Sequence, residues 1–401
     1  MLTVADHLSR AASVEEAESR PTLLAVSPVP AWPASDGMAL RVSRLLQELS
    51  SRWSIVLICP AGGESAASNG VTLGAEITFD RDGQWMYLPS QYNVRAFVRI
   101  VAETIRAHRP SVALLWGGME YLRRAIPEMP PSISDRVDCM ALAAWRNLVH
   151  ARGYAELRPR LSHFAHVTRY EFQMRRESAA TVVVGDADAR VLRQMIGVSN
   201  VHVIPNGVDI PDVAAVERSL RPTVMFTGVM TYQPNIDAVL YFADAIWPAV
   251  HERIPHAVFQ IVGRAPAPVI VALASRAGIE VVADVKSVQA KLAQAWLAVA
   301  PMRTGAGIKN KVLEAWSVGT PAVMTPIATN GLTQAPPELL LAAEGVELSV
   351  LVGDLLLDAE RRAFLGDLAR TTAKVAFSWR SRGIAFDQLL RDVCLELAPA
   401  G

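Results

Sequence analysis

The residues best suited to chemistry form one dense cluster in the C-terminal half, over residues 300–331. A short apolar run is followed by a glycine-rich turn, which opens a helical pattern carrying Lys309, Lys311 and Glu314. Glycines let a backbone approach a ligand, a helix N-terminus offers free N–H groups, and a lysine completes an anion site. Lys311 and Glu314 are three residues apart and share one helix face. That face suits a diphosphate beside a ribose, with the lysine on the phosphates and the glutamate on the hydroxyls.

Other interpretations of the same cluster are weaker. A dinucleotide fingerprint would need glycine at position 310, which is Asn, and a P-loop would need Gly-Lys-Ser/Thr. Neither NAD binding nor ATP hydrolysis is therefore favoured. The Lys311–Glu314 spacing is also that of an ordinary surface ion pair, which contributes little. His163 and His166 lack further ligands nearby, and no cluster has metal-ligand spacing, so we expect no metal and no cofactor.

Composition limits the classes of protein. The chain has 401 residues, which is enough for two to three domains. Its content of 51% hydrophobic and 19% charged residues excludes a disordered chain. Its 39 Lys and Arg balance 39 Asp and Glu, which argues against a nucleic-acid partner. Three scattered cysteines favour a reducing compartment. The polar leader over residues 1–20 is no secretory signal, and no apolar window spans a membrane. A cytoplasmic protein follows, with peripheral contact to the inner face of the plasma membrane left open.

Short apolar runs alternate with helical patterns in both halves of the chain, which predicts α/β units on parallel sheets. In the first half we expect strands at Thr22–Ser27, Ser54–Cys59, Val112–Trp116, Ala180–Val184 and Val201–Ile204, and helices at Ala39–Leu49, 94–107, Ala155–Ser178 and Asp186–Met195. In the second half we expect strands at Thr223–Thr227, Ala257–Val262, Ile279–Val282, Leu297–Ala300 and Ala322–Thr325. We expect helices there at Ile236–Val250, 267–276, Val288–Ala295, from the glycine-rich turn through Ser317, and at Ser378–Leu397.

Two such halves imply two Rossmann-like domains facing a cleft. The pattern lapses into Pro, Asp, Glu and Arg around 210–222, where we place the domain boundary. We expect an N-terminal domain over 21–212 and a C-terminal domain over 213–376. Ligands of such sheets bind outside the carboxyl ends of the strands.

Four stretches resemble a known family. They are VVVGDAD at Val182–Asp188, IPNGVD at Ile204–Asp209, FTGVMTYQPNIDA at Phe226–Ala238, and GIKNKVLE at Gly307–Glu314 with GTPAV ending at Val323. The chain resembles the family 4 glycosyltransferases of GT-B architecture, in particular the bacterial exopolysaccharide-type sugar transferases. The resemblance implies a nucleotide-sugar donor bound mainly by the C-terminal domain. It also implies a final helix, over 377–401, that crosses back to the N-terminal domain.

The resemblance carries roles onto single residues. Glu314 matches the ribose-binding glutamate, and Lys311 and Arg303 are candidates for the diphosphate. These three residues and Asp138 are the candidates for catalysis. Gly37 matches the glycine that lets the N-terminal domain close on the diphosphate. Asp138, near the end of an N-terminal strand, is the candidate on the acceptor side. The remaining donor-site candidates are Val282 and Val285 beside the nucleobase, and Gly228, Gly263, Gly305, Gly307, Ile308, Lys309 and Asn310.

The sequence departs from the family at two places. Many members have a glutamate eight residues before the ribose glutamate, where this chain has Ala306. Many also have an arginine and a lysine after the first C-terminal strand, where Gly228 is followed here by Val229 and Met230. Arg303, Lys309 and Lys311 could supply the missing cations.

The expected function is transfer of a sugar from a nucleoside-diphosphate sugar, with retention of configuration, in polysaccharide, glycolipid or natural-product biosynthesis. The acceptor would be a glycan, a lipid-linked molecule or a small molecule. Two alternatives stay open: a nucleotide-sugar epimerase of the same fold, and a catalytically silent binding protein, which Ala306 favours. The Arg-rich pattern over Ala155–Ser178 fits a solvated helix face or a surface for anionic lipid.

Overall fold

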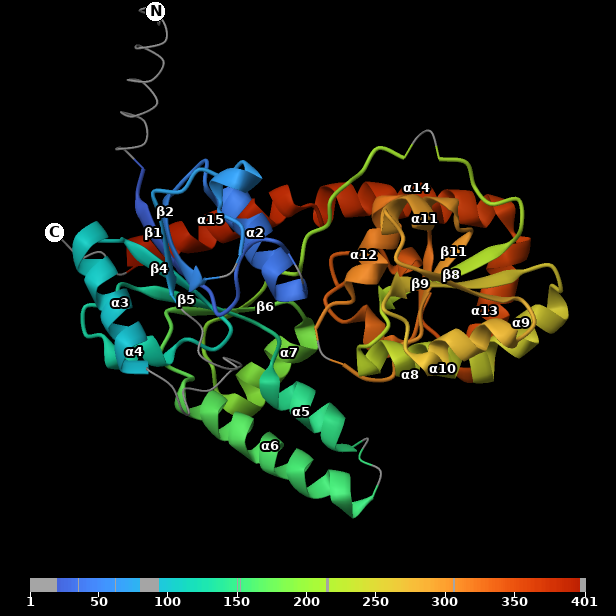
Figure 1. Ribbon diagram of the computed structural model, residues 1–401, viewed down its shortest axis with the longest axis horizontal. Helices are drawn as coiled ribbons and strands as arrows, with labels where there is room; N and C mark the ends of the chain where they lie inside the picture. The colour runs from blue at the N-terminus through green and yellow to red at the C-terminus, as the bar shows by residue number, and fades with distance from the viewer. Residues whose placement is uncertain are drawn as a thin grey trace, which may run out of the picture.

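The computed structural model describes residues 20–34, 36–61, 63–79, 94–149, 151, 153–213, 216–305 and 307–396. Almost all of the predicted polar leader, and Ala306, therefore lie outside the described residues. The described residues form two parallel sheets, each covered by helices on both faces (Figure 1). The seven-stranded sheet has the order β3 (Ala75–Phe79), β2 (Ser54–Pro60), β1 (Thr22–Val26), β4 (Val112–Trp116), β5 (Ser132–Val137), β6 (Ala180–Val183), β7 (Val201–Val203). The five-stranded sheet has the order β10 (Ile279–Ala283), β9 (Val258–Arg264), β8 (Thr223–Val229), β11 (Leu297–Ala300), β12 (Ala322–Met324).

Side chains of the first sheet alternate between two cores, as a strand's period of two requires. Leu23 and Ala25 of β1 face helices α2 (Gly37–Leu49) and α15 (Trp379–Glu396). Leu24 and Val26 face α3 (Val94–His108) on the other side. The sequence of a parallel strand that is covered on both faces is a nearly continuous apolar run, which is why β1 could be recognised in the sequence.

The second sheet is packed into one apolar core with its helices. Phe226 of β8, Phe259 of β9 and Trp316 are fully buried in this core. The helices of this domain are α8 (Gln233–Tyr241), α9 (Trp247–Arg253), α10 (Pro268–Val271), α11 (Val288–Gln294), α12 (Asn310–Ser317), α13 (Gly345–Leu357) and α14 (Ala359–Ala376).

The last helix, α15, leaves the C-terminal domain and packs on the N-terminal one. Figure 1 shows α14 and α15 in red, running along the top of the molecule from one domain to the other. Phe386 and Leu390 of α15 are buried against α2 and the first sheet. Asp387 accepts hydrogen bonds from Trp53 Nε1 at 2.8 Å and Arg52 Nη1 at 3.1 Å. The two domains and the crossing helix confirm the GT-B architecture.

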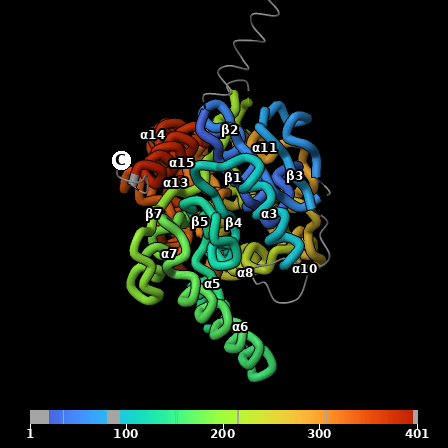
Figure 2. Tube along the Cα trace, turned by 90° about the vertical axis from the view of Figure 1, so that its left-hand side faces the viewer, coloured from blue at the N-terminus to red at the C-terminus, as the bar shows by residue number. Residues whose placement is uncertain are grey.

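Two helices project from the N-terminal domain as an antiparallel hairpin (Figures 1 and 2), formed by α5 (Met140–Val149) and α6 (Tyr154–Gln173). Glu171 of α6 is buried at the start of α5 and accepts the backbone N–H groups of Met140 at 2.9 Å and Ala141 at 3.2 Å. A carboxylate on free N–H groups stabilises a helix N-terminus. This contact joins the two helices of the hairpin, and Oε1 of Glu171 also lies 3.9 Å from Nη1 of Arg136 in the sheet. The short helices α4 (Tyr121–Ala125) and α7 (Asp186–Val191) complete this domain.

The structure contains the elements that the sequence predicted, with small changes in their bounds, and adds others. All ten predicted strands are present, each within two residues of its expected bounds. The predicted helix over 267–276 is divided into α10 and a 3₁₀ turn at Ala272–Ser275, and the one over Asp186–Met195 ends in a π turn. Strand β5 was missed because it is polar: Ser134, Asp135 and Arg136 are buried among hydrogen-bond partners rather than apolar neighbours.

Candidate functional site

The turn between β11 and α12 depends on its glycines. Gly305 has φ 99° and Gly307 has φ 63°, in the left-handed region that residues with a Cβ rarely adopt. A Cβ at Gly307 would lie 2.0 Å from Oδ1 of Asp138 in the opposite domain. The turn can therefore approach the N-terminal domain only because it lacks side chains there.

Lys311 and Glu314 lie on one face of α12, as predicted. Nζ of Lys311 donates a hydrogen bond to Oδ1 of Asn235 at 2.7 Å and lies 3.9 Å from the centre of the Phe226 ring. Burial lowers the pKa of Lys311 to about 7, while the nearby Glu314 opposes this change. Burial raises the pKa of Glu314, and Lys311 opposes that. Each charge is thus held where water stabilises it poorly and where a ligand of opposite charge would stabilise it strongly.

A second pair of charges meets across the cleft. Lys309 is buried and its Nζ donates to the carbonyl of Gly307 at 2.9 Å. Burial lowers the pKa of Lys309 to about 8, and the carboxylate of Asp138 opposes this. Burial also raises the pKa of Asp138 to about 6, with repulsion from Asp188 adding to the effect and Lys309 opposing it. Asp138 comes from the N-terminal domain and Lys309 from the C-terminal one, so their attraction favours a closed cleft.

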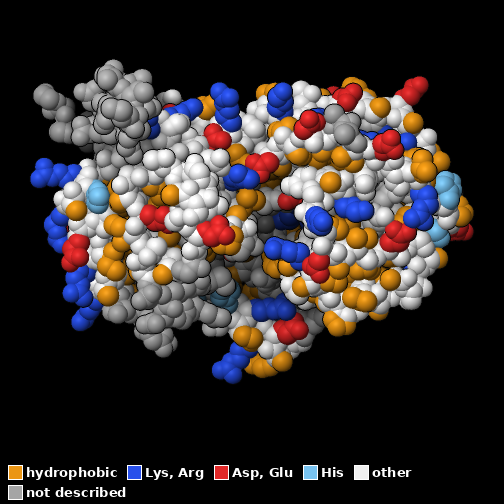
Figure 3. Space-filling model, turned by 45° about the horizontal axis from the view of Figure 1, so that its top comes forward, with side chains coloured by type: hydrophobic (Ala, Val, Ile, Leu, Met, Phe, Trp, Pro, Cys, Tyr) orange, Lys and Arg blue, Asp and Glu red, His pale blue; other side chains and the backbone are white. Residues whose placement is uncertain are grey.

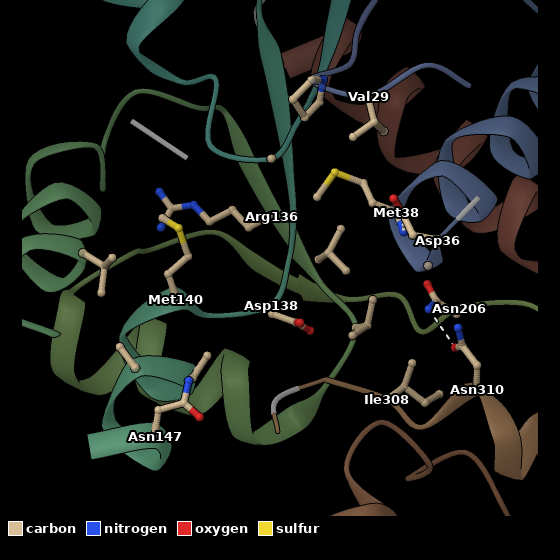
Figure 4. A pocket seen from close by; sticks show the side chains of 18 of the residues that line it. Val29, Asp36, Met38, Arg136, Asp138, Met140, Asn147, Asn206, Ile308 and Asn310 are labelled. Carbon is tan, nitrogen blue, oxygen red and sulfur yellow. Dashed lines mark hydrogen bonds between the residues drawn. The ribbon is translucent and has the colours of Figure 1, made fainter. Parts of the chain in front are cut away.

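Several hydrogen-bonded contacts cross from one domain to the other, and three of them join segments that follow strands of the two sheets. Nη1 of Arg146 in α5 donates to the carbonyl of Gly305 at 2.8 Å. Nδ2 of Asn206 donates to Oδ1 of Asn310 at 2.9 Å (Figure 4). The third contact is made by Asn330, whose side chain donates to Asp188 and accepts from the backbone of the α7 segment. Two of the three contacts hold the glycine-rich turn and the start of α12 against the N-terminal domain.

A cavity of about 700 Å³ lies between the hairpin, the carboxyl ends of the N-terminal strands and the start of α12. Its wall is mainly apolar, and four predicted site residues line it: Gly37, Asp138, Ile308 and Asn310. Figure 4 shows Asp138 pointing into this space from one side, with Ile308 and Asn310 opposite. These lining residues were not predicted from the sequence: Pro28, Val29, Asp36, Met38, Arg136, Met140, Asn147, His163, Val167 and Asn206. Several follow strands, so proximity to a strand's carboxyl end was the available signal.

The other predicted donor residues lie outside that cavity. Gly228 and Gly263 are register partners at the ends of β8 and β9, and a Cβ at Gly263 would lie 1.9 Å from the Gly228 carbonyl oxygen. Val282 is in β10, and Val285 follows it. These positions follow the carboxyl edge of the second sheet.

Arg303 is engaged by neighbours within its own domain. Its Nε donates to Asp237 at 3.0 Å, and its guanidinium lies 4.8 Å from the centre of the Tyr241 ring. Lys309 and Lys311 flank Asn310 in the chain, and Asn310 makes one of the contacts between the domains described above. In Figure 3, Lys and Arg side chains, interspersed with Asp and Glu, border the hollow between the two domains.

Two kinds of feature are absent from the described part of the chain. No group of three or more His, Cys, Asp or Glu side chains there could hold a metal ion. No helix in the same residues is both long and apolar enough to cross a bilayer.

Comparison with solved structures shows the fold. A glycosyltransferase from Rickettsia africae superposes with a TM-score of 0.69 at 11% identity, covering 95% of this chain and 100% of that one. The Anabaena protein HepE, in complex with UDP and glucose, gives 0.64 at 12% identity, with 93% and 100% covered. A trehalose 6-phosphate synthase from Burkholderia multivorans gives 0.61 at 12% identity, with 94% and 100% covered.

Comparison with family models identifies both halves. A search of curated protein sequences gives no significant match. The model for Glycosyltransferase Family 4 matches residues 35–211, and the model for Glycosyl transferases group 1 matches residues 221–348. Together they cover about three quarters of the chain, and they agree with the motifs at Ile204–Asp209 and Gly307–Glu314. The chain therefore belongs to the family 4 glycosyltransferases, with the GT-B fold.

Proposed function

We propose that this glycosyltransferase takes a sugar from a nucleoside-diphosphate sugar bound at α12 and transfers it, without a metal, to an acceptor in the N-terminal cavity. The observation that carries the proposal is the pair Lys311 and Glu314 on one face of α12, the helix whose first residue, Asn310, lines the cavity. HepE, of the same fold, has been solved with UDP and glucose and with UDP-glucose. The donor here would be of the same chemical class.

Each charged side chain would have a separate role toward the donor. Glu314 would accept hydrogen bonds from the ribose hydroxyls. Lys311, with Lys309 beside it, would neutralise the diphosphate as the sugar leaves and negative charge grows there. Asp138 would face the reacting sugar from the other domain. In a transfer with retention, the leaving diphosphate itself can take the acceptor proton, so the protein needs no separate base.

The nucleobase and the outer donor groups would lie along the carboxyl edge of the second sheet. The backbone at Val282 and Val285 would border the base. Gly228 and Gly263 would leave room for the phosphates and the sugar. Arg303 would contact the diphosphate only if it left Asp237, so we propose a smaller role for Arg303 than for Lys311 and Lys309.

The acceptor would carry an apolar portion and be presented at a membrane surface. The cavity wall contributed by the hairpin is largely apolar, with Met140, Ala143 and Val167. The hairpin also exposes large apolar side chains to solvent, among them Trp145, Tyr154, Leu157 and Leu161. Exposed apolar and aromatic groups together with arginines such as Arg158 are what an anionic lipid surface binds. The enzyme would then work in the cytoplasm, in peripheral contact with the inner face of the plasma membrane.

Calorimetry with UDP-, GDP-, TDP- and ADP-glucose tests the donor half. One of these should bind the wild type, and Lys311→Ala should weaken it by about tenfold or more, the effect of losing a charged contact. Each donor is also incubated with the enzyme alone: epimerised sugar would favour the alternative activity. Failure of every donor and every free diphosphate to bind would overturn the proposal.

Flotation with vesicles of neutral and anionic phospholipid tests the acceptor half. The double variant Leu157→Asp/Leu161→Asp should lose most vesicle binding, because two apolar contacts are removed and negative charge is added. Leu220→Asp is the matched control, since Leu220 is 99% exposed but lies far from the hairpin in sequence. Equal loss in all variants, or no binding by the wild type, would refute the membrane contact and leave the donor proposal standing.

A further inference from the structure

A fully buried arginine lies directly beneath the cleft. Arg41 of α2 donates from Nε to Oδ2 of Asp135 at 2.7 Å and from Nη1 to Oδ1 of Asn206 at 2.9 Å. It also donates to two backbone carbonyls of the segment that follows β7. Asp135 accepts a further hydrogen bond from Trp116 Nε1 at 2.9 Å. A buried charge with this many partners is expensive to move, so its contacts are fixed.

The fixed arginine determines which way the amide of Asn206 faces. A carboxamide has one acceptor oxygen and one NH₂ donor group, whereas a guanidinium can only donate. Because Arg41 is bonded to Oδ1 of Asn206, the NH₂ group of Asn206 must face the other way. It donates to Oδ1 of Asn310 at 2.9 Å, across the cleft (Figure 4).

The same rule then determines the amide of Asn310. Its oxygen is occupied by Asn206, so its own NH₂ group faces away from that contact. A Cβ placed on Gly37 would have Nδ2 of Asn310 as its nearest neighbour, at 3.8 Å. Gly37 and Asn310 both line the cavity, so the two N–H donors of the Asn310 amide lie at its rim. The buried Arg41 thus fixes the orientation of the Asn206 amide, which in turn fixes the amide of Asn310 at the rim of the cleft.

We propose that Asn206 is a positioning residue, which fixes the side chain of Asn310 so that its NH₂ group faces the cleft beside Gly37. The inference rests on the proposed function for its ligand, an oxygen of the donor's diphosphate. N–H groups aimed in advance at that oxygen stabilise its charge, whereas a carbonyl oxygen in their place would repel it. Asn206 itself need not touch the donor.

The variant Asn206→Asp tests the orientation. A carboxylate still accepts from Arg41 and strengthens that pair, so the fold should survive. Its second oxygen cannot donate, so the amide of Asn310 should turn its NH₂ group toward the new carboxylate and present its oxygen to the cleft. In protein labelled with ¹⁵N-asparagine, the wild type should give a nuclear Overhauser contact between the Asn310 NH₂ protons and the Gly37 Hα protons. The variant should lose it.

Calorimetry with a nucleoside diphosphate and with its nucleoside tests the consequence. Asn206→Asp should weaken binding of the nucleoside diphosphate by about tenfold or more and leave binding of the nucleoside nearly unchanged. Asn200→Asp is the matched control: it makes the same change at the other end of β7, where Asn200 donates to the carbonyl of Ala179 at 2.8 Å. It should retain both the contact and the affinity of the wild type.

The outcomes separate the two proposals. Persistence of the Asn310–Gly37 contact in Asn206→Asp overturns the positioning role, and any loss of affinity is then mere charge repulsion. Loss of the contact with full diphosphate affinity overturns the assignment of the diphosphate to Asn310. Failure of the donor site itself appears separately, as absence of nucleotide binding in the wild type.

Discussion

At the scale of single residues, burial disfavours the charge of the two lysines at the start of α12. Only five lysines occur in the chain, and two of them lie where α12 begins: Lys309 directly before the helix and Lys311 in its first turn. Burial lowers the pKa of Lys311 to about 7, so near neutral pH a large share of this amine is uncharged. A bound diphosphate would favour its protonated form. Donor binding and protonation of Lys311 are therefore linked.

We predict that donor affinity falls as pH rises above about 7. Below that pH the free protein already carries the charge, and affinity should be flat. Above it, binding must take up a proton, so the affinity should fall by up to about tenfold per pH unit. Titration calorimetry with the nucleotide sugar, whose diphosphate diester does not titrate in this range, measures the slope. Lys311→Arg keeps its charge throughout and should flatten the curve; a slope unchanged in that variant would assign the effect to another group.

The shared face of Lys311 and Glu314 on α12 could be predicted from the sequence, whereas the contacts under the cleft could not. Lys311 and Glu314 are close together in one helix, so their spacing shows that they share a face. Asn206 lies in an Asn-Gly dipeptide, which by itself is a turn signal. Its role depends on Arg41, far away in the chain, and such pairings arise only in the folded structure.

At the scale of elements, the glycine-rich turn sets how closely α12 can approach the N-terminal domain. The turn has two glycines with positive φ, and one of them almost touches Asp138. A side chain added at Gly307 would strain the backbone, and it would also displace Asp138.

We predict that Gly307→Ala weakens donor binding and lowers stability by about 2–3 kcal/mol, because strain at positive φ and displacement of Asp138 add. Gly70→Ala is the matched control, with φ 70° and no atom within 4 Å of its added Cβ. It should cost only about 1 kcal/mol and leave donor binding unchanged. Thermal unfolding and calorimetry measure both effects. Equal costs at the two positions would mean that the contact with Asp138 has no energetic weight.

Element prediction succeeded where burial and hydrophobicity coincide. The apolar strands β1, β4 and β8 were recognised from their composition alone. Strand β5 carries Ser, Asp and Arg inside the sheet, because these side chains bind Arg41 and Glu120 instead of apolar neighbours. Helices α13 and α14 lie in a region for which the sequence pattern gave no assignment.

At the scale of the whole molecule, the repeat of α/β units made the two-domain fold predictable. How the two domains meet was less accessible, since Arg146, Asn206 and Asn330 each bond to a distant part of the chain. These contacts have a shared consequence. They bring an arginine and amide groups from both domains to the cleft, where we propose that the donor binds.

We predict that donor binding survives chelation. Lys309 and Lys311 supply positive charge at the proposed diphosphate position, so a divalent cation has no necessary place there. Calorimetry in excess EDTA should give an affinity within about twofold of that in Mg²⁺, a difference below about 0.5 kcal/mol. An affinity that collapses with EDTA and returns with Mg²⁺ or Mn²⁺ would contradict the assignment of the diphosphate to these lysines.

The cleft contacts also predict a change of shape. Gly37 and Asn310 are close together in this structure, so a donor can enter only if the domains first separate, and then both can contact it when they close. Small-angle scattering should therefore give a smaller radius of gyration with saturating nucleoside diphosphate than without it. Arg146→Ala removes the bond to the Gly305 carbonyl and should shift the free protein toward the open form. Because only the closed form binds with full affinity, this variant should show a several-fold weaker apparent donor affinity. A scattering profile that neither the ligand nor Arg146→Ala changes would mean that the two domains move as one body.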